Sequence, residues 1–350
     1  MQALPTSTGG PPVEIREAIR KAVSGKNLTV DETTEVFTRI MEGEATDAQI
    51  AALIVALRLK GETVDEVTGA ATAMREKAEP VVPEYTDYLV DTCGTGGDQS
   101  NTFNISTAAA FVAAAAGARV AKHGNRSVSS RSGSADVLEA LGVNIGISPA
   151  DMKTCLDEIG ICFLFAPALH KAMKFAAGPR KEIGVRTVFN ILGPLTNPAG
   201  ARNQVLGVYS YELTELMGSV LKNLGSERAF VVHGLDPLDE VSLSSETRVT
   251  ELCDGALKTY TVTPRTFGLE EASLDAIRGG TAEENATIVR GVLEGKPGPC
   301  RDIVLLNAGF AIAAAGLAET PAGGIDLAAK AIDSGAAADK LRRLAELTAE

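Results

Sequence analysis

The sequence has 350 residues, of which 45% are apolar and 4% aromatic, with no tryptophan and a formal net charge of −12. A chain of this length exceeds the size at which one hydrophobic core usually stops growing, so we expect one large domain and a smaller one. An acidic chain with few aromatic rings is poorly suited to bind duplex DNA or to stack single-stranded bases, and we expect no nucleic-acid partner.

The start of the chain and its cysteines point to the cytoplasm. Residues 1–11 have neither a basic start nor an apolar core and are expected to form a disordered tail. No apolar run approaches the ~20 residues that a membrane span needs. The five cysteines are odd in number and never spaced C-x-x-C, which disfavours a disulfide framework and a structural zinc site. We expect reduced thiols, a cytoplasmic location and no membrane partner.

The segment 12–80 is expected to form a small helical domain. Its helical patterns end at Gly25, Gly43 and Gly61. Each is followed by a capping box, formed by Thr29 with Glu32, Thr46 with Gln49, and Thr63 with Glu66. The helix predicted over 49–60 is apolar around most of its circumference, which a helix with one exposed face would not need. We therefore expect this helix to be buried on two sides and the protein to form a homodimer through this domain.

Residues 81–350 alternate short β-rich runs with alanine-rich helical stretches, which is typical of a mostly parallel sheet. The expected strands are 88–92, 119–122, 161–165, 204–209 and 228–233. The cluster 193–200 (GPLTNPAG) is too rich in Gly, Pro and Asn for a regular element, so we expect a crossing between domains there. A segment near 183–203 should join the helical domain. The predicted fold class is α/β, with a small N-terminal helical domain and a larger α/β domain (81–350).

A glycine turn follows the first expected strand. Residues 94–98 read GTGGD, and residues 104–107 (NIST) lead into an alanine-rich helix. A strand, a glycine turn and a helix start in this order present backbone N–H groups to a phosphate. A dinucleotide fingerprint needs glycine where Gln99 stands, and a Walker loop needs Gly-Lys-Ser/Thr, so neither NAD nor ATP is favoured. Taken alone, such a run is more often a structural turn, with Ser106 and Thr107 as helix caps.

A basic loop, 122–130 (KHGNRSVSS), follows the next expected strand. In a parallel sheet it opens at the same carboxyl edge as the glycine turn, so both face one crevice. No Asp or Glu occurs between Asp98 and Asp136. The basic residues of this acid-free segment are Arg119, Lys122, Arg126 and Arg131. Because solvated loops of acidic proteins usually include acids, we expect this one to bind a molecule with several phosphate groups and a sugar.

An acidic pair, Asp239 and Glu240, follows the strand 228–233 through a turn. At a loop end both carboxylates can reach a hard divalent cation, which a pyrophosphate substrate needs. Taken alone, neighbouring acids are more often solvated surface. His233 is expected to pack at the strand end, because three scattered histidines do not form a zinc cluster.

A second basic segment follows Glu158, and Glu182 is its only acid before Glu212. Its basic residues are His170, Lys171, Lys174, Arg180, Lys181, Arg186 and Arg202. Lys171 and Lys174 are expected on a solvated helix face. Arg180 follows Gly178-Pro179 in an expected turn, and we favour a functional role for it, binding a second anionic ligand.

Together these motifs resemble the anthranilate phosphoribosyltransferases, enzymes of the tryptophan pathway. The likeness covers most of the chain, including the stretch 190–198 (NILGPLTNP), and the loop 122–130 is its most specific element. It implies transfer of the phosphoribosyl group of phosphoribosyl pyrophosphate to the amine of anthranilate, the second step of tryptophan biosynthesis from chorismate. It implies no catalytic side chain beyond the ligands of the substrates and the metal.

The resemblance also implies the site residues. Those for phosphoribosyl pyrophosphate are Gly94, Gly97, Asp98, Thr102, Asn104, Ile105, Ser106, Thr107, Lys122, His123, Gly124, Asn125, Arg126, Ser127, Val128, Ser129, Ser130 and Ser134. Those for anthranilate are Gly94, Asn125, Arg180 and Gly193, with Arg180 on the carboxylate. Magnesium, as two ions per monomer, would be held by Ser106, Asp239 and Glu240.

Two alternatives stand beside this interpretation. A pyrimidine nucleoside phosphorylase has a similar architecture, but its lysine loop carries a glycine-rich pattern that differs from KHGNR at 122–126, and it needs no acidic metal pair. A non-catalytic relative would bind nucleic acid through the same groove. The pair Asp239–Glu240 and the acidic composition disfavour that alternative.

Overall fold

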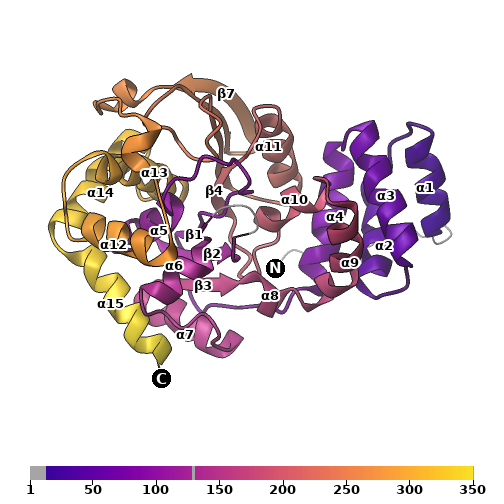
Figure 1. Ribbon diagram of the computed structural model, residues 1–350, viewed down its shortest axis with the longest axis horizontal. Helices are drawn as coiled ribbons and strands as arrows, with labels where there is room; N and C mark the ends of the chain where they lie inside the picture. The colour runs from indigo at the N-terminus through magenta and orange to yellow at the C-terminus, as the bar shows by residue number, and fades with distance from the viewer. Residues whose placement is uncertain (1–12, 128–130, 350) are drawn as a thin grey trace. The chain divides into compact units, whose positions relative to one another are not determined.

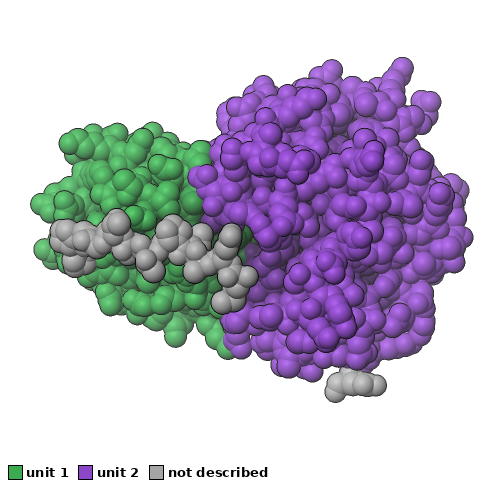
Figure 2. Space-filling view, turned by 180° about the vertical axis from the view of Figure 1, so that it is seen from behind, with its two compact units in different colours: residues 1–78, 170–196 green, residues 79–169, 197–350 purple. Residues whose placement is uncertain are grey.

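The computed structural model describes residues 13–127 and 131–349. The chain divides into two compact units (Figure 2): unit 1 comprises Met1–Ala78 and His170–Thr196, and unit 2 comprises Glu79–Leu169 and Asn197–Glu350. The expected disordered tail, 1–11, lies outside the described residues. Among the described residues, no helix is both long enough and apolar enough to span a bilayer.

Unit 1 is helical, as the sequence predicted. Its first part contains α1 (Ile15–Val23), α2 (Val30–Met41), α3 (Asp47–Lys60) and α4 (Val64–Lys77). Its second part contains η1 (Lys171–Met173), α9 (Lys174–Ile183), α10 (Phe189–Leu192) and η2 (Gly193–Leu195). The three predicted capping boxes, at Thr29, Thr46 and Thr63, are all formed. Each threonine hydroxyl accepts a backbone N–H that the start of a helix would otherwise leave unpaired.

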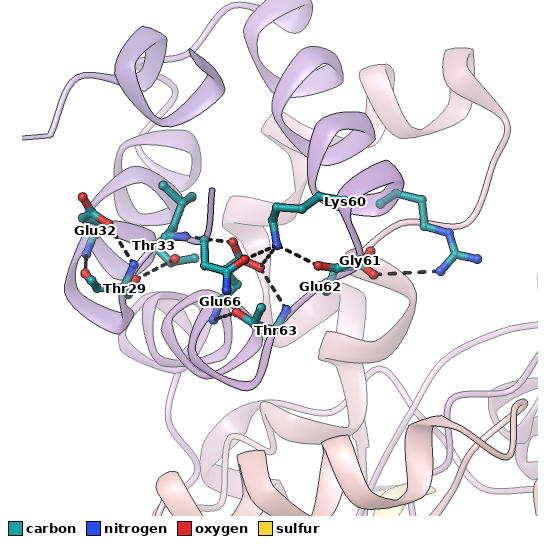
Figure 3. A network of polar contacts seen from close by, with 11 residues as sticks. Thr29, Glu32, Thr33, Lys60, Gly61, Glu62, Thr63 and Glu66 are labelled. Carbon is teal, nitrogen blue, oxygen red and sulfur yellow. Dashed lines mark hydrogen bonds and ion pairs between the residues drawn. The ribbon is translucent and has the colours of Figure 1, made fainter. Parts of the chain in front are cut away.

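The third capping box is part of a buried ion pair (Figure 3). Glu66 Oε2 accepts from the Lys60 ammonium and from the Thr63 backbone N–H, both at 2.9 Å. Glu66 Oε1 accepts from the Leu28 backbone N–H, also at 2.9 Å. A buried charge pair is tolerated when hydrogen bonds satisfy its remaining lone pairs. Here those bonds tie the start of α4 to the end of α3 and to the loop before α2.

The chain rejoins unit 1 over His170–Thr196, where the sequence led us to expect a segment near 183–203. Helix α9 packs against α3 and α2, and a Cβ on Gly43 would meet the Phe175 ring at 2.7 Å. The pair Gly178-Pro179, expected as a turn, lies inside α9. The return to unit 2, between Thr196 and Asn197, falls within the cluster 193–200.

His170 is buried at the start of this segment, which makes stability depend on pH. Burial lowers the pKa of His170 from 6.5 to about 4. As the pH falls below 6.5, the unfolded chain binds a proton that the folded chain excludes, so stability is lost between about pH 6.5 and 4. The loss is about 3 kcal/mol at most. We expect His170→Gln to flatten this part of the stability profile in urea unfolding, and an unchanged slope would refute the assignment.

Unit 2 contains a seven-stranded sheet in the order β3-β2-β1-β4-β5-β6-β7. Five strands are parallel: β3 (Ile161–Phe165), β2 (Arg119–Gly124), β1 (Leu89–Asp91), β4 (Asn203–Gly207) and β5 (Arg228–Gly234). They correspond to the five predicted strands, and the mostly parallel sheet is confirmed. The sequence analysis missed β6 (Thr247–Cys253) and β7 (Ala256–Val262), which form an antiparallel hairpin at one edge.

Helices cover the sheet of unit 2 (Figure 1). On one side, α5 (Ile105–Ala115) and α13 (Pro299–Ala314) contact strands, and α12 (Ala282–Leu293), α14 (Pro321–Asp333) and α15 (Ala336–Ala349) pack around them. On the other side, α11 (Leu213–Asn223) contacts β5, β6 and β7. The remaining elements are α6 (Ser134–Ala140), α7 (Pro149–Ile159), α8 (Ala166–Leu169), η3 (Pro264–Phe267) and η4 (Leu274–Ile277).

The strand order determines where a ligand can bind. Strand β1 pairs with β2 on one side and with β4 on the other, so the connections leaving β1 and β4 run in opposite directions across the sheet. Such a switch point leaves a crevice at the carboxyl ends of the strands, where open α/β sheets bind their ligands. The glycine turn 94–98 follows β1, and Gly207 ends β4, so both lie at this edge.

Candidate active site

The glycine turn 94–98 is held against the end of β4. The Thr95 backbone N–H donates to the Gly207 carbonyl at 2.8 Å, and the Tyr209 backbone N–H donates to the Thr95 hydroxyl at 3.1 Å. Gly96 and Gly97 have φ angles of 64° and 80°, which only glycine adopts without strain. The predicted turn is therefore formed.

The acidic pair meets both the glycine turn and the start of α5. Asp239 Oδ2 accepts from the Gly96 backbone N–H at 2.8 Å, and the Asp239 backbone N–H donates to Asp98 Oδ2 at 3.4 Å. Glu240 Oε1 accepts from the Ser106 backbone N–H at 3.1 Å. We call these five residues, Gly96, Asp98, Ser106, Asp239 and Glu240, the acidic cluster.

The carboxylates of the acidic cluster repel one another in a dehydrated environment. Burial, joined by the charges of Asp98 and Glu240, raises the pKa of Asp239 well above its usual value. Burial also raises the pKa of Glu240 to about 7, although the Lys122 ammonium opposes this rise. Crowded carboxylates gain from a bound cation, and their hard oxygen donors suit Mg²⁺. The residues therefore fit the metal that the resemblance implies.

Lys122 lies in β2 rather than in a loop. Its side chain is buried, and the ammonium donates to the Thr92 carbonyl at 3.0 Å, the Thr92 hydroxyl at 3.1 Å and the Ser106 hydroxyl at 3.3 Å. This places a positive charge beside the start of α5. His123, the next residue along the strand, is also buried, and its backbone N–H donates to Asp91 Oδ1 at 3.1 Å.

The other cations of the acid-free segment lie differently from the expectation. Arg126 pairs with Asp136 at 2.8 Å and with Glu139 at 2.6 Å, because α6 brings acids beyond the segment back to it. Arg119, at the start of β2, donates to the Leu156 carbonyl at 2.8 Å. Arg131 is exposed. Of these four cations, Lys122 alone contacts the acidic cluster in the part of the chain that the structure describes.

The remaining predicted phosphate ligands lie in the segments 94–107 and 122–134. Asn104 Nδ2 donates to the Ser132 carbonyl at 3.2 Å, and Thr102 forms a β-bridge with Arg278. Helix α5 begins after Asn104, so Ser106 and Thr107 do not cap it. Among these predicted ligands, Gly94, Gly97, Gly124, Asn125, Ser127 and Ser134 are exposed or half-buried, whereas Ile105 and Thr107 are buried. Val128, Ser129 and Ser130 lie outside the described residues.

Unit 1 holds the other two predicted anthranilate residues, Arg180 and Gly193. Arg180 lies on α9, and its guanidinium is 5.1 Å from the centre of the Phe189 ring. Burial lowers the pKa of Arg180, and no carboxylate among the described residues forms an ion pair with it. A dehydrated guanidinium of this kind suits an anionic ligand. Lys171 and Lys174 are exposed, as expected.

Three residues that shape the site were missed from the sequence. A Cβ on Gly207 would lie 1.6 Å from the Asp239 carbonyl oxygen. Asn285 Nδ2 donates to Asn104 Oδ1 at 2.9 Å. Asn307 Oδ1 accepts from the Val241 backbone N–H at 2.9 Å. No local pattern marks these positions, because each acts on a segment far away in the sequence.

Both parts of the chain place it in the glycosyl transferase class. Residues 86–338 match the a/b domain of the glycosyl transferase family, and residues 16–78 match its helical bundle domain. The fold class predicted from the sequence is confirmed by both matches.

Known relatives narrow this class. The anthranilate phosphoribosyltransferase of Moorella thermoacetica is 57% identical over 330 residues, which are 94% of this chain and 97% of that protein. The crystal structure of the Thermus thermophilus enzyme of the same name is 46% identical, with a TM-score of 0.91 over 95% of this chain and 99% of that chain. The Saccharomyces cerevisiae enzyme in complex with PRPP and Mg is 29% identical, with a TM-score of 0.87 over 96% and 98%. This chain belongs to the anthranilate phosphoribosyltransferase family.

Proposed function

We propose that the protein transfers the phosphoribosyl group of phosphoribosyl pyrophosphate to the amine of anthranilate. The products are N-(5-phosphoribosyl)anthranilate and pyrophosphate, and the reaction is the second step of tryptophan biosynthesis from chorismate. The acidic cluster at the switch point carries this proposal, because it joins an anion-binding helix start to carboxylates that suit a divalent ion. Family membership supports it. We assign binding of the metal and of phosphoribosyl pyrophosphate to the α/β domain (81–350), and the helical domain (12–80) is joined by His170–Thr196.

The reaction is a displacement at the anomeric carbon. The amine nitrogen forms the new bond as the bond to pyrophosphate breaks, and positive charge develops on the ribose ring. An arylamine is already neutral at physiological pH, so the protein has to position it rather than deprotonate it first. Two magnesium ions, held by Ser106, Asp239 and Glu240, would neutralise the leaving pyrophosphate. No residue is assigned to accept the proton that the amine loses.

The phosphate groups would be bound by backbone N–H groups and by one buried cation. The glycine turn 94–98 and the start of α5 present N–H groups at the carboxyl edge of the sheet. The Lys122 ammonium beside Ser106 adds a fixed positive charge. The proposed ligands of phosphoribosyl pyrophosphate are Gly94, Gly97, Asp98, Thr102, 104–107, 122–130 and Ser134.

For anthranilate, we propose Gly94, Asn125, Arg180 and Gly193. Arg180→Ala should raise the KM for anthranilate by roughly tenfold to a hundredfold, the loss expected for one charge-assisted contact, and leave the KM for phosphoribosyl pyrophosphate nearly unchanged. Lys122→Ala should raise the KM for phosphoribosyl pyrophosphate and leave the KM for anthranilate nearly unchanged. Steady-state kinetics with each substrate varied in turn measure both. The control is Lys181→Ala, which removes an exposed cation next to Arg180 on α9.

If Arg180→Ala raises the KM for both substrates by the same factor, Arg180 belongs to the phosphate site and the two-pocket assignment is refuted.

We also propose a homodimer formed through the helical domain. Leu59 on α3 is 82% exposed and Val23 at the end of α1 is 70% exposed, and these two helices pack together. We expect Leu59 and Val23 to contribute to one apolar patch, the kind of surface that marks an interface. Light scattering at micromolar concentration should give twice the 36.3 kDa chain mass, and Leu59→Glu should lower it. A wild-type protein of single-chain mass would refute the dimer.

The direct test mixes the protein with phosphoribosyl pyrophosphate, magnesium and anthranilate and follows anthranilate fluorescence. We expect a loss of fluorescence that requires all three additions. A folded protein that consumes no anthranilate, or that cleaves a pyrimidine nucleoside with phosphate instead, would refute the proposal. All five cysteines are free thiols, which agrees with the cytoplasmic location that we propose.

A further inference from the structure

The segment before α12 lies against the loop that leads into α5. The Phe103 backbone N–H donates to the Ile277 carbonyl at 3.2 Å, and the Gly279 backbone N–H donates to the Asn101 carbonyl at 2.8 Å. A Cβ on Gly279 would lie 2.6 Å from the Thr102 carbonyl oxygen, so only glycine allows this approach. Residues 277–279 therefore support the strand-like stretch just before the proposed phosphate ligand Asn104.

Asn285 extends this support to the Asn104 side chain. It lies in the first turn of α12, is only 2% exposed and accepts from the Gly280 backbone N–H at 2.7 Å through Oδ1. Its Nδ2 donates to Asn104 Oδ1 at 2.9 Å, and Asn104 Nδ2 donates to the Ser132 carbonyl at 3.2 Å. The chain of bonds therefore joins three segments: the start of α12, the start of α5 and the loop before α6.

This chain of bonds has a fixed direction. A backbone N–H can only donate, so Gly280 requires the oxygen of Asn285 to face it. The Asn285 amide then presents its N–H₂ to Asn104, so the side-chain oxygen of Asn104 must accept this bond. The N–H₂ group of Asn104 consequently faces the Ser132 carbonyl. The partners thus fix the orientation of both amides.

The start of α12, on which Asn285 lies, is closed by a capping box. The Thr281 backbone N–H donates to Glu284 Oε2 at 2.7 Å, and the Glu284 backbone N–H donates to the Thr281 hydroxyl at 3.3 Å. This capping box fixes the turn on which Asn285 lies. A buried amide on a capped helix loses little further freedom when a ligand binds next to it.

We propose that Asn285 is a positioning residue for phosphoribosyl pyrophosphate, acting through the Asn104 side chain. The inference rests on the proposed function and deepens it. Asn285 holds Asn104 in one orientation and keeps the start of α5 in register with Ser132, in the loop that leads into α6 at Ser134. Preorganisation of this kind lowers the cost of binding the first substrate, and it leaves the amine of the second substrate unaffected.

The test measures binding of phosphoribosyl pyrophosphate with magnesium by calorimetry, without anthranilate, together with steady-state kinetics. Asn285→Ala should weaken this binding about fivefold to thirtyfold, the effect of one or two lost hydrogen bonds. The KM for anthranilate should change less than about twofold. Asn285→Ser, which keeps a hydroxyl near Gly280 but is too short to reach Asn104, should show the same loss and covers the case in which the alanine variant fails to fold.

A double-mutant cycle separates positioning from plain stabilisation. If Asn285 acts through Asn104, then Asn285→Ala should cause no further loss of binding in an Asn104→Ala background. The control is Asn144→Ala, which also removes an amide that accepts one backbone N–H, that of Gly146 at 2.9 Å, and it should bind as wild type.

Wild-type affinity in Asn285→Ala, or an equal loss in the Asn104→Ala background, would overturn this inference alone. A folded wild-type protein that binds no phosphoribosyl pyrophosphate would overturn the proposed function as well.

Discussion

The double variant Asp239→Asn/Glu240→Gln should lower turnover by on the order of a hundredfold or more at limiting magnesium. Both replacements keep the shape of the side chains and remove the negative charges that would hold the divalent ions. Without those ions, the leaving pyrophosphate has no counter-charge. Kinetics across a magnesium titration, with both substrates saturating, measure the effect.

Stability should change in the opposite sense to activity. Burial raises the pKa of both acids, so the ionised carboxylates are costly in the metal-free protein. Neutral amides of the same size relieve that cost, and the metal-free double variant should melt no lower than wild type. The control is Glu270→Gln/Glu271→Gln, which changes two exposed acids that are adjacent to each other in the sequence. Unchanged turnover in Asp239→Asn/Glu240→Gln would show that the acidic cluster does not hold the metal.

The parallel strands could be predicted because buried strands carry a strong local signal. The predicted strand 161–165 has the same bounds as β3, a short apolar run that follows the glycine ending α7. The hairpin of β6 and β7 carries a turn signal that the sequence analysis missed: Asp254-Gly255 separates the paired residues Cys253 and Ala256, and its φ angles of 50° and 73° suit a two-residue hairpin turn. Strand β7 lies at the edge of the sheet with most of its side chains exposed, so polar residues such as Lys258 and Thr259 interrupt its pattern.

The candidate site could be predicted in outline because its ligand-binding segments follow the carboxyl ends of parallel strands. The glycine turn after β1 and the basic loop 122–130 were placed from that rule, whereas the pair Asp239–Glu240 was assigned to the metal from the resemblance. Counting charges along the sequence was less reliable. It predicted that Arg126 has no acidic neighbour, whereas α6 brings Asp136 and Glu139 into ion pairs with it.

Tertiary packing also overrode local preference in the second basic segment. Gly178-Pro179 favours a turn, and a proline inside a helix costs about 3 kcal/mol. Burial of Pro179 and packing of α9 against α2 and α3 nevertheless accompany a helix through Arg180. Neither the burial of Pro179 nor the packing of α9 can be inferred from the local sequence around Gly178-Pro179.

Gly207→Ala should abolish most activity through a single methyl group. The added Cβ would lie 1.6 Å from the Asp239 carbonyl oxygen and 2.5 Å from its carbon, and both atoms belong to the backbone. A side chain cannot rotate out of this clash, so the segment carrying Asp239 must move away from β4. The Gly207 carbonyl also holds the Thr95 N–H at 2.8 Å, which means that the movement separates the acids from the glycine turn.

The expected loss of turnover is about a hundredfold, the effect of moving a catalytic group by roughly an ångström. Overpacking should also cost about 1–3 kcal/mol of stability. The kinetics should therefore be measured well below the melting temperature of the variant. The control is Gly291→Ala on α12, where the Cβ would meet only the Lys296 side chain, at an ordinary 3.5 Å. Because the close approach exists only if Asp239 lies over the end of β4, wild-type turnover in Gly207→Ala would refute this arrangement of the acidic cluster.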